Sequence, residues 1–412
     1  ANNFINLNLI KYSAILSFLI FFNYFLWTID SPPIIRFINF AIISFAIIYF
    51  FISKNFNNFW YLKIIIFLLF LICLGTPTIP IDSRTLFLFP AKMLFYESDL
   101  YFRLENYFYP INHLGHNFLD TVYSRPKLAV TLSATFAQII GLWNDIFPRA
   151  TNIIIILPPI IFLISFFKDK IFIILWLFLM LFFSGKLFIN GLMDGILSLY
   201  FISSLLVVYL IQTNAYETQK KLLYFIMIIF LAILSLSKHE GAVIVLAILL
   251  SSIFVGFYYD KKVDYKILII TIISLLPIIF WRYVFLISDS KMEFLDYGNP
   301  INRFFARLTN PDDLLTLFSF LINNDKFIIS LFTFVFVAFK YFKNNKRLIV
   351  FISINFLFYF SALLAAVLLS THTVLEQLEQ SSARIFIPLV LMLVYFSIFI
   401  VKNNYSFEKK TV

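Results

Sequence analysis

The sequence predicts an all-α protein, a polytopic transmembrane helical bundle of about twelve spans that forms a single domain over residues 1–412. Apolar runs of roughly 20 residues recur along the chain, the length that one helix needs to cross a bilayer. Hydrophobic residues make up 61% of the chain and charged residues only 13%, too few polar groups to cover a soluble protein of this length. The net charge of +10 comes from short basic clusters between apolar runs. This is a pattern of membrane topology and argues against a nucleic-acid partner.

The expected spans follow in chain order. The first apolar run, Leu9–Ile29, is longer than the core of a signal peptide and no small-residue cleavage site follows it, so we expect a retained helix. The single cysteine, Cys73, falls inside an apolar run, which excludes disulfides and cysteine-based metal sites. The twelve spans are predicted near residues 9–29, 34–53, 61–79, 151–167, 171–189, 193–212, 221–237, 240–258, 266–287, 326–343, 347–370 and 384–401.

The distribution of charge predicts the orientation of these spans. Assigning alternate connections to opposite sides places 17 of the 32 basic residues and five of the 22 acidic residues on one side. The other side takes 15 basic and 17 acidic residues, so the two sides carry net charges of +12 and −2. Because lysine and arginine collect in short cytoplasmic loops, both termini are expected in the cytoplasm. The extracytoplasmic segments, which hold nearly every chemically interesting side chain, are then 80–150, 186–194, 237–241, 288–325 and 371–384.

The first extracytoplasmic loop, 80–150, is too long to be an idle connection. It places Asp82 at the membrane boundary, a few residues before two cations, Arg84 and Lys92. A carboxylate there could act as a general base toward an acceptor hydroxyl or bind a metal, and the alternative is a structural pair with Arg84.

Further along this loop, the apolar stretch from Leu128 to Phe147 predicts a helix that lies on the outer surface of the membrane or re-enters it. The aromatic stretch Tyr101–Tyr109 suits a membrane interface. The pair His113 and His116 lacks a third ligand nearby, so no metal site is predicted there.

Two tight turns carry ionisable residues at the same boundary. Asp194 enters a span from outside and could be a functional acid, a helix N-cap or both at once. Lys238 and Glu240 flank His239 in a turn with almost no loop, and Lys238 suits a phosphate as a point charge. The alternative for this turn is a simple Lys–Glu pair.

The last two features lie nearer the C-terminus. Arg384 begins the final span from outside, where it either holds a phosphate at headgroup depth or only extends its side chain to the interface. The second large extracytoplasmic segment, 288–325, is charged and predicts a mobile or substrate-contacting loop. Basic residues at headgroup depth, an acid at the end of a span and a large loop together favour a site for a lipid-borne, phosphate-containing substrate.

Four stretches in order resemble motifs of the C-type (GT-C) glycosyltransferase superfamily, whose members take sugars from polyprenyl-phosphate donors at the outer face of the membrane. A weaker match falls at Arg384. The four stretches are Pro80-Ile-Asp82-Ser-Arg84 through Pro90-Ala-Lys92, Arg125-Pro126-Lys127-Leu128 continuing to Gly141-Leu-Trp-Asn144, Asn190-Gly-Leu-Met-Asp194-Gly195, and Leu236-Ser-Lys238-His239-Glu240-Gly241.

The resemblance implies a bacterial inner-membrane enzyme with a periplasmic active site, a polyprenyl-phosphate-linked sugar donor, and a glycan, lipid or protein acceptor. It implies that Asp82 is the base and that the other candidate residues bind substrate: Arg84, Lys92, Asp194, Lys238, Glu240 and Arg384. The first outer loop has one Asp where many relatives have an acidic pair, so a reaction without metal or other cofactor is expected. An O-antigen polymerase or ligase using undecaprenyl-pyrophosphate glycans is one alternative. A lipid-linked sugar transporter or flippase is the other, and span centres almost free of charge count against it.

Overall fold

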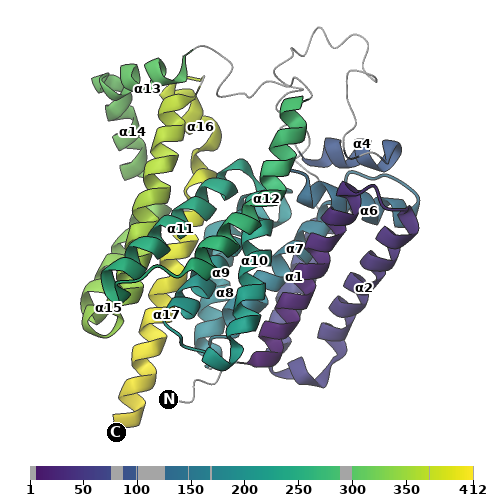
Figure 1. The fold of residues 1–412 in the computed structure, drawn as a ribbon, viewed down its shortest axis with the longest axis horizontal. Helices are drawn as coiled ribbons and strands as arrows, with labels where there is room; N and C mark the ends of the chain where they lie inside the picture. The colour runs from purple at the N-terminus through teal and green to yellow at the C-terminus, as the bar shows by residue number, and fades with distance from the viewer. Residues whose placement is uncertain are drawn as a thin grey trace.

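The computed structural model describes residues 6–75, 87–98, 100, 126–146, 148–167, 169–287, 299–370 and 372–411 (Figure 1). Within these residues the regular structure is helical, without strands, which confirms the predicted all-α class. The helices are α1 (Leu7–Thr28), α2 (Pro33–Ile52), η1 (Lys54–Phe59), α3 (Trp60–Gly75), α4 (Phe89–Glu97), α6 (Leu128–Ile140), η5 (Pro148–Ala150), α7 (Thr151–Ile164), α8 (Lys170–Ile189), α9 (Asp194–Gln212), η6 (Glu217–Gln219), α10 (Lys220–Ser237), α11 (His239–Asp260), α12 (Tyr265–Ile287), α13 (Pro300–Leu308), α14 (Pro311–Asn323), α15 (Asp325–Leu369), α16 (Val374–Ile385) and α17 (Ile387–Thr411).

Nine helices of the described residues are long and apolar enough to cross a membrane, so the chain is a membrane protein. The helices α3 and α7 are apolar but shorter, with 16 and 14 residues. The 45-residue α15 leaves helical backbone angles at Tyr341 and Asn345, so it joins two apolar stretches at a bend. Each predicted span coincides with a described helix over most of its length. The count of twelve crossings stays a prediction.

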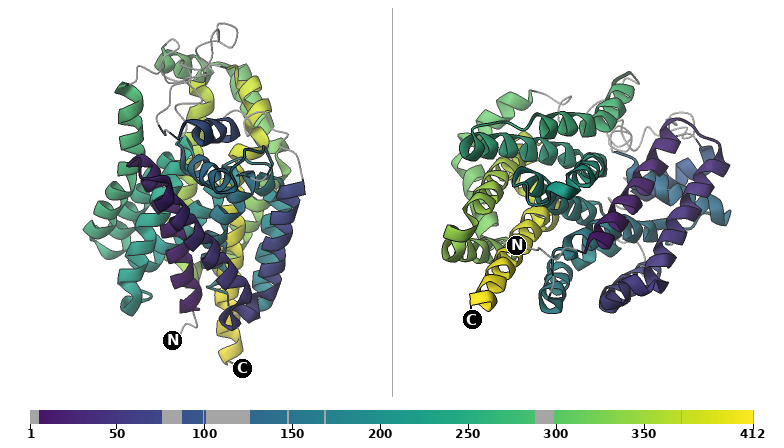
Figure 2. Two further views of the ribbon diagram at one scale, coloured as in Figure 1. Left: turned by 90° about the vertical axis from the view of Figure 1, so that its right-hand side faces the viewer. Right: turned by 60° about the horizontal axis from the view of Figure 1, so that its bottom comes forward.

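The two termini lie at the same end of the bundle (Figures 1 and 2). We call this the proximal end, and the opposite end, where α9 begins and α10 finishes, the distal end. The helix α9 is central, with 94% of its most apolar window buried, whereas α2 and α12 bury 28% of theirs. The exposed side chains of α2 and α12 are mostly large and apolar, as expected of helices that face lipid.

The helix α6 packs into the distal end of the bundle instead of lying on its surface. Its residues from Leu128 to Thr135 are buried, and Trp27 of α1 donates its indole N–H to Thr135 Oγ1 at 2.9 Å. The helix finishes at Ile140 because Gly141 adopts a left-handed φ of 80°. The predicted helix is therefore confirmed but shorter than the apolar run to Phe147.

The described part of segment 288–325, which the sequence predicts to be extracytoplasmic, is also helical. Arg307 of α13 donates hydrogen bonds to the carbonyl oxygens of Val367, Leu368 and Ser370 at 2.9–3.3 Å and thereby covers the end of α15. A small separate core joins α14, α15 and α16 through Leu317, Val367, Leu368, Val374 and Leu378. The charge pattern of 288–325 predicted a loop, whereas the described residues 300–323 form the two helices α13 and α14.

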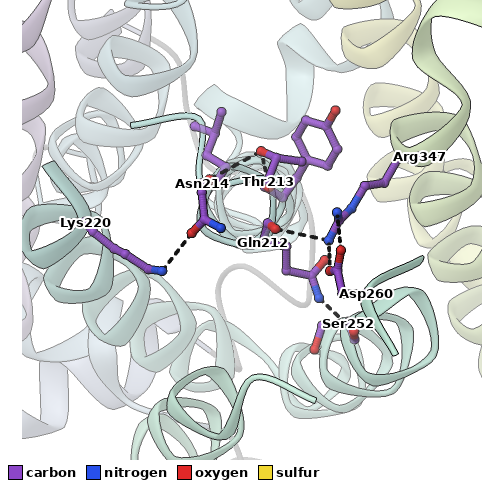
Figure 3. A network of polar contacts seen from close by, with 9 residues as sticks. Gln212, Thr213, Asn214, Lys220, Ser252, Asp260 and Arg347 are labelled. Atoms are coloured by element: carbon purple, nitrogen blue, oxygen red, sulfur yellow. Dashed lines mark hydrogen bonds and ion pairs between the residues drawn. The ribbon is translucent and has the colours of Figure 1, made fainter. Parts of the chain in front are cut away.

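A polar network ties three helices together at the proximal end (Figure 3). Arg347, just past the bend of α15, forms a bidentate ion pair with Asp260 at the end of α11. The same guanidinium donates to the carbonyl oxygen of Gln212, the last residue of α9, at 3.0 Å. Gln212 in turn donates to the carbonyl oxygen of Ser252 at 2.7 Å. Cations suit helix C-termini, so these contacts stabilise the bundle.

Candidate functional site

All four buried charged side chains of the described residues lie toward the distal end. They are Arg36, Lys127, Arg149 and Asp194. Each stands in the first turn of α2, α6, α7 or α9, or within a few residues before it. Removing a charge from water is costly unless a partner compensates it. The concentration of buried charge at one end therefore marks that end as the candidate site.

Two of these residues have structural partners. The Arg36 guanidinium stacks on the Trp27 ring, 3.6 Å from its centroid, and so fixes α2 against α1. Arg149 donates a hydrogen bond to the carbonyl oxygen of Cys73, near the end of α3. Neither Arg36 nor a role for Arg149 was predicted from the sequence, because both are isolated arginines beside apolar runs.

The centre of the candidate site is a charged triad of Asp194, Lys238 and Glu240. Lys238 Nζ lies 3.0 Å from Asp194 Oδ1 and 2.8 Å from Glu240 Oε1. The exposed fractions of these side chains are 12% for Lys238, 2% for Asp194 and 29% for Glu240. Met193 is the N-cap of α9, so the N-cap interpretation of Asp194 is wrong by one residue. One cation thus holds two carboxylates from different helices.

The local backbone explains why this triad forms. The helix α10 finishes at Ser237 and α11 begins at His239, so Lys238 alone, in an extended conformation, connects two antiparallel helices. A Cβ atom on Gly241 would lie 1.9 Å from the carbonyl oxygen of Leu234, closer than any side chain permits. Glycine is therefore required one residue after Glu240, because α10 and α11 cross in backbone contact there.

A second polar pair lies beside the triad. Arg282 of α12 places Nη2 2.7 Å from Nδ1 of His239. Tyr359 of α15 is buried close enough to both triad carboxylates for their charges to act on it. Arg282 was missed in the sequence because it stands inside an apolar run, where the only signal is a single cation in a predicted span.

Lys127, the N-cap residue of α6, approaches α12 next to Arg282. Its Nζ is 6.0 Å from the ring centroid of Trp281, the neighbour of Arg282. Burial lowers the pKa of Lys127 from its usual value to about 7, because the charged form loses its hydration. Near neutral pH this amine can therefore both accept and release a proton.

A small cavity extends from the start of α9 toward α4 and α6. Its lining includes the buried polar residues Ser133, Arg149 and Asn152, together with Gly191 and Met193 just before Asp194. The lining also includes Phe87 and Leu88, the first described residues after Arg84.

The structure brings together three of the seven predicted site residues, the members of the triad. Lys92 is exposed on α4, and Arg384 is half-buried in the last turn of α16; neither belongs to the ion pairs of the triad. The predicted base Asp82, with Arg84, His113 and His116, lies outside the described residues. Within the described residues, no three His, Cys, Asp or Glu side chains are grouped as metal ligands would be.

Comparison with known proteins gives no match: no family model, no curated protein and no solved structure matches this chain. The resemblance to C-type glycosyltransferases therefore depends on the four sequence motifs alone. The class that fold and site define is a helical membrane protein with a largely buried ion pair of Asp194 and Lys238 at the distal end of its bundle.

Proposed function

We propose that this chain is an inverting glycosyltransferase that moves a sugar from a polyprenyl-phosphate-linked donor to an acceptor at the periplasmic face of the bacterial inner membrane. The observation that carries the proposal is the triad Asp194–Lys238–Glu240, in which Asp194 is buried and the other two side chains are partly buried. Two of the four motifs supply these residues, and the triad lies opposite the predicted cytoplasmic termini. A structural ion pair needs one carboxylate, and a second carboxylate on the same cation leaves acceptor oxygens for sugar hydroxyls.

In the proposed reaction, an acceptor hydroxyl attacks the anomeric carbon of the donor sugar and gives its proton to the carboxylate of Asp82. The new C–O bond forms as the anomeric C–O bond to phosphate breaks, and the electron pair leaves with the polyprenyl phosphate. Attack from the face opposite the leaving group inverts the anomeric configuration.

The triad suggests a division of roles around this reaction. Lys238 already has two carboxylates within 3.0 Å, so a phosphate must compete with both of them for this amine. We therefore assign Lys238 chiefly to holding Asp194 and Glu240 in position for the sugar hydroxyls, and the leaving phosphate chiefly to other cations. Arg384 stays a candidate for that phosphate.

The distribution of buried charge disfavours transport as the function. A transporter or flippase carries ionisable residues near mid-membrane, where its substrate binds. In the described part of the chain, the buried charged residues lie at or before the first turns of their helices. An O-antigen polymerase or ligase remains the second enzyme class, since it would use similar outer-face residues, and it differs in releasing a pyrophosphate.

The test is sugar transfer by the purified full chain in nanodiscs, with radiolabelled polyprenyl-phosphate sugars and released polyprenyl phosphate as the readout. Asp82→Asn should lower the transfer rate about 100- to 10,000-fold, the usual range for loss of a general base. The matched control is Lys186→Gln, which removes one exposed charge at the end of α8. Retained transfer in Asp82→Asn would remove Asp82 from the role of base. Failure to release polyprenyl phosphate from any donor would refute the enzyme class.

A further inference from the structure

The proximal end carries a group of lysines on two segments that the network in Figure 3 holds together. Residues 260–266, around the connection of α11 to α12, include three lysines and two aspartates. Residues 340–347, at the bend of α15, include three lysines and one arginine without an acid, so the two segments together have a net charge of +5. All six lysines are exposed, and we call them the lysine cluster: Lys261, Lys262, Lys266, Lys340, Lys343 and Lys346.

The ion pair of Arg347 with Asp260 fixes the two segments side by side (Figure 3). Arg347 Nη1 donates to Asp260 Oδ1 at 2.9 Å, and the same guanidinium donates to the carbonyl oxygen of Gln212. Lys261 directly follows Asp260, and Lys346 directly precedes Arg347. The lysines after α11 and those at the bend of α15 therefore lie next to each other, although 87 residues separate Asp260 from Arg347.

The acidic side chains of these segments do not neutralise the lysine cluster. Asp260 is paired with Arg347. Asp264 accepts a hydrogen bond from the backbone N–H of Lys266 at 2.9 Å and one from the hydroxyl of Tyr224 at 3.3 Å. In the part of the chain that the structure describes, no member of the lysine cluster belongs to an ion pair. Because like charges held together repel one another, this surface gains free energy by binding an anion.

Exposed aromatic rings place the lysine cluster at the membrane interface. Lys261 Nζ lies 6.0 Å from the ring centroid of Phe257 and 5.9 Å from that of Tyr258, and these rings are 64% and 53% exposed. Phe339, just before the bend of α15, is 88% exposed. Exposed aromatic rings beside lysines are typical of the headgroup level of a bilayer, and the predicted orientation makes this the cytoplasmic face. An anionic lipid fits such a surface better than a soluble partner does.

The backbone at Lys261 is in a conformation that favours another residue. Lys261 is the C-cap of α11 and has a left-handed φ of 54°. Glycine adopts this conformation at lower cost than a residue with a side chain. The charge of Lys261 offsets this cost either through the dipole of α11 or through a bound anion, and the two explanations differ in a measurable way.

We propose that the lysine cluster binds an anionic phospholipid with two phosphate groups, of the cardiolipin type. One phosphate lies at Lys261 and Lys262. The other lies at the bend of α15, at Lys343 and Lys346, and the acyl chains lie along the exposed aromatic rings. A phospholipid with one phosphate would engage only one of these two lysine pairs, whereas basic pockets between membrane helices suit a headgroup with several charges. This site is separate from the distal triad and does not depend on the proposed function.

The first experiment measures lipid binding by native mass spectrometry of the purified full chain in a neutral detergent. Cardiolipin or phosphatidylglycerol is added, and we expect cardiolipin to bind about tenfold more tightly or better. The double variant Lys343→Gln with Lys346→Gln should raise the Kd for cardiolipin about 10- to 30-fold, because each basic residue near a membrane surface contributes a factor of about five. Arginine at both positions should retain the affinity.

The matched control removes the same charge from the same end of the molecule. Lys11→Gln with Lys54→Gln changes two exposed lysines, one on α1 and one in η1, which lie across the bundle from α15 (Figure 1). The net charge falls as much as in the first double variant, but the lysine cluster stays intact. The Kd for cardiolipin should therefore change by about threefold or less.

The second experiment separates binding from folding at Lys261. Lys261→Gly relieves the left-handed backbone, so the unfolding temperature without cardiolipin should stay the same or rise. The Kd for cardiolipin should nevertheless rise about fivefold. A lower unfolding temperature with an unchanged Kd would assign Lys261 to the dipole of α11 and remove it from the lipid site.

Three results would overturn the inference: an equal Kd in the two double variants, phosphatidylglycerol binding as tightly as cardiolipin, or an unchanged Kd in Lys261→Gly. The first two results would reduce the lysine cluster to diffuse attraction for any anionic membrane. None of these measurements involves sugar transfer, so failure of the lipid site and failure of the proposed enzyme are distinguishable.

Discussion

Replacing Lys238 with methionine should destabilise the protein more than any other single substitution in the triad. Lys238 lies within 3.0 Å of both Asp194 and Glu240. Its loss would leave two carboxylates facing each other, with Asp194 almost entirely removed from water. Removing one partner of a buried ion pair typically costs about 3–5 kcal/mol, and we expect Lys238→Met to fall in that range.

The two acids should cost less, in an order set by their burial. Asp194→Asn leaves the pair of Lys238 with Glu240 intact but removes a buried charge-assisted hydrogen bond, for an expected loss of about 2 kcal/mol. Glu240→Gln removes the more exposed carboxylate, for about 1 kcal/mol or less. The double variant Asp194→Asn with Lys238→Met should cost less than the sum of its single changes, because it removes opposite charges together.

The assay is thermal unfolding of each variant in the same detergent, with the half-life at one temperature as a second measure if unfolding is irreversible. Lys186→Gln serves as the control for removal of one exposed charge. If Lys238→Met unfolded like this control, or if Glu240→Gln cost as much as Lys238→Met, Lys238 would not compensate the buried charge of Asp194 in the way that the distances indicate.

Four further predictions concern single positions. Gly241→Ala should destabilise by about 3 kcal/mol or more, because the new Cβ would meet Leu234 O at 1.9 Å. Gly185→Ala, which meets nothing within 4 Å, should be neutral or stabilise by up to about 1 kcal/mol in the same unfolding assay. Arg347→Gln should cost about 1 kcal/mol, because its ion pair is partly exposed, and a loss near that of Lys238→Met would contradict this. For Lys127 the folded-state pKa of about 7 lies below the usual 10.5, so the unfolded chain binds more protons between these values. Stability should then rise with pH across this window, by at most about 1.4 kcal/mol per pH unit, and unfolding measured from pH 7 to 10 should show a flatter slope in Lys127→Met.

Hydrophobic run length was enough to predict the fold class and the approximate positions of the apolar helices in the described residues. The energetic cost of exposing backbone to lipid forces helices wherever apolar runs recur, so no knowledge of packing was needed. The prediction was less complete for segments outside those runs. The packing of α6 into the bundle depends on contacts such as Trp27 with Thr135, and residues so distant in sequence leave no periodic signal. The helices α13 and α14 were read as a charged loop, because the arginines that cover the end of α15 resemble solvated charges in the sequence.

The members of the triad were predictable because each stands in a short motif at the end of an apolar run. Lys238 and Glu240 occupy a turn that is too short and too charged to be a plain connection between two apolar runs, and they were predicted as site residues for this reason. Arg282 stands alone in an apolar run, so the sequence gives no such signal for it. Its contact with His239, 43 residues away, forms only when α11 packs against α12. Lys127 was noted only as the flank of an apolar helix, since its burial follows from how α6 packs.

In the described part of the chain, the ion pairs lie at the two ends of the bundle and are of two kinds. At the proximal end, Arg347 pairs with Asp260, and both side chains are partly exposed. The Arg347 guanidinium also donates to the last carbonyl of α9, so helix capping is a sufficient explanation of this contact. At the distal end, the triad places one cation on two carboxylates, with Asp194 buried at the first turn of α9. Such an arrangement stabilises a bundle less than apolar side chains of the same volume would. Stability therefore explains the proximal network but not the distal triad, and this difference is the physical reason to propose the distal end as the functional site.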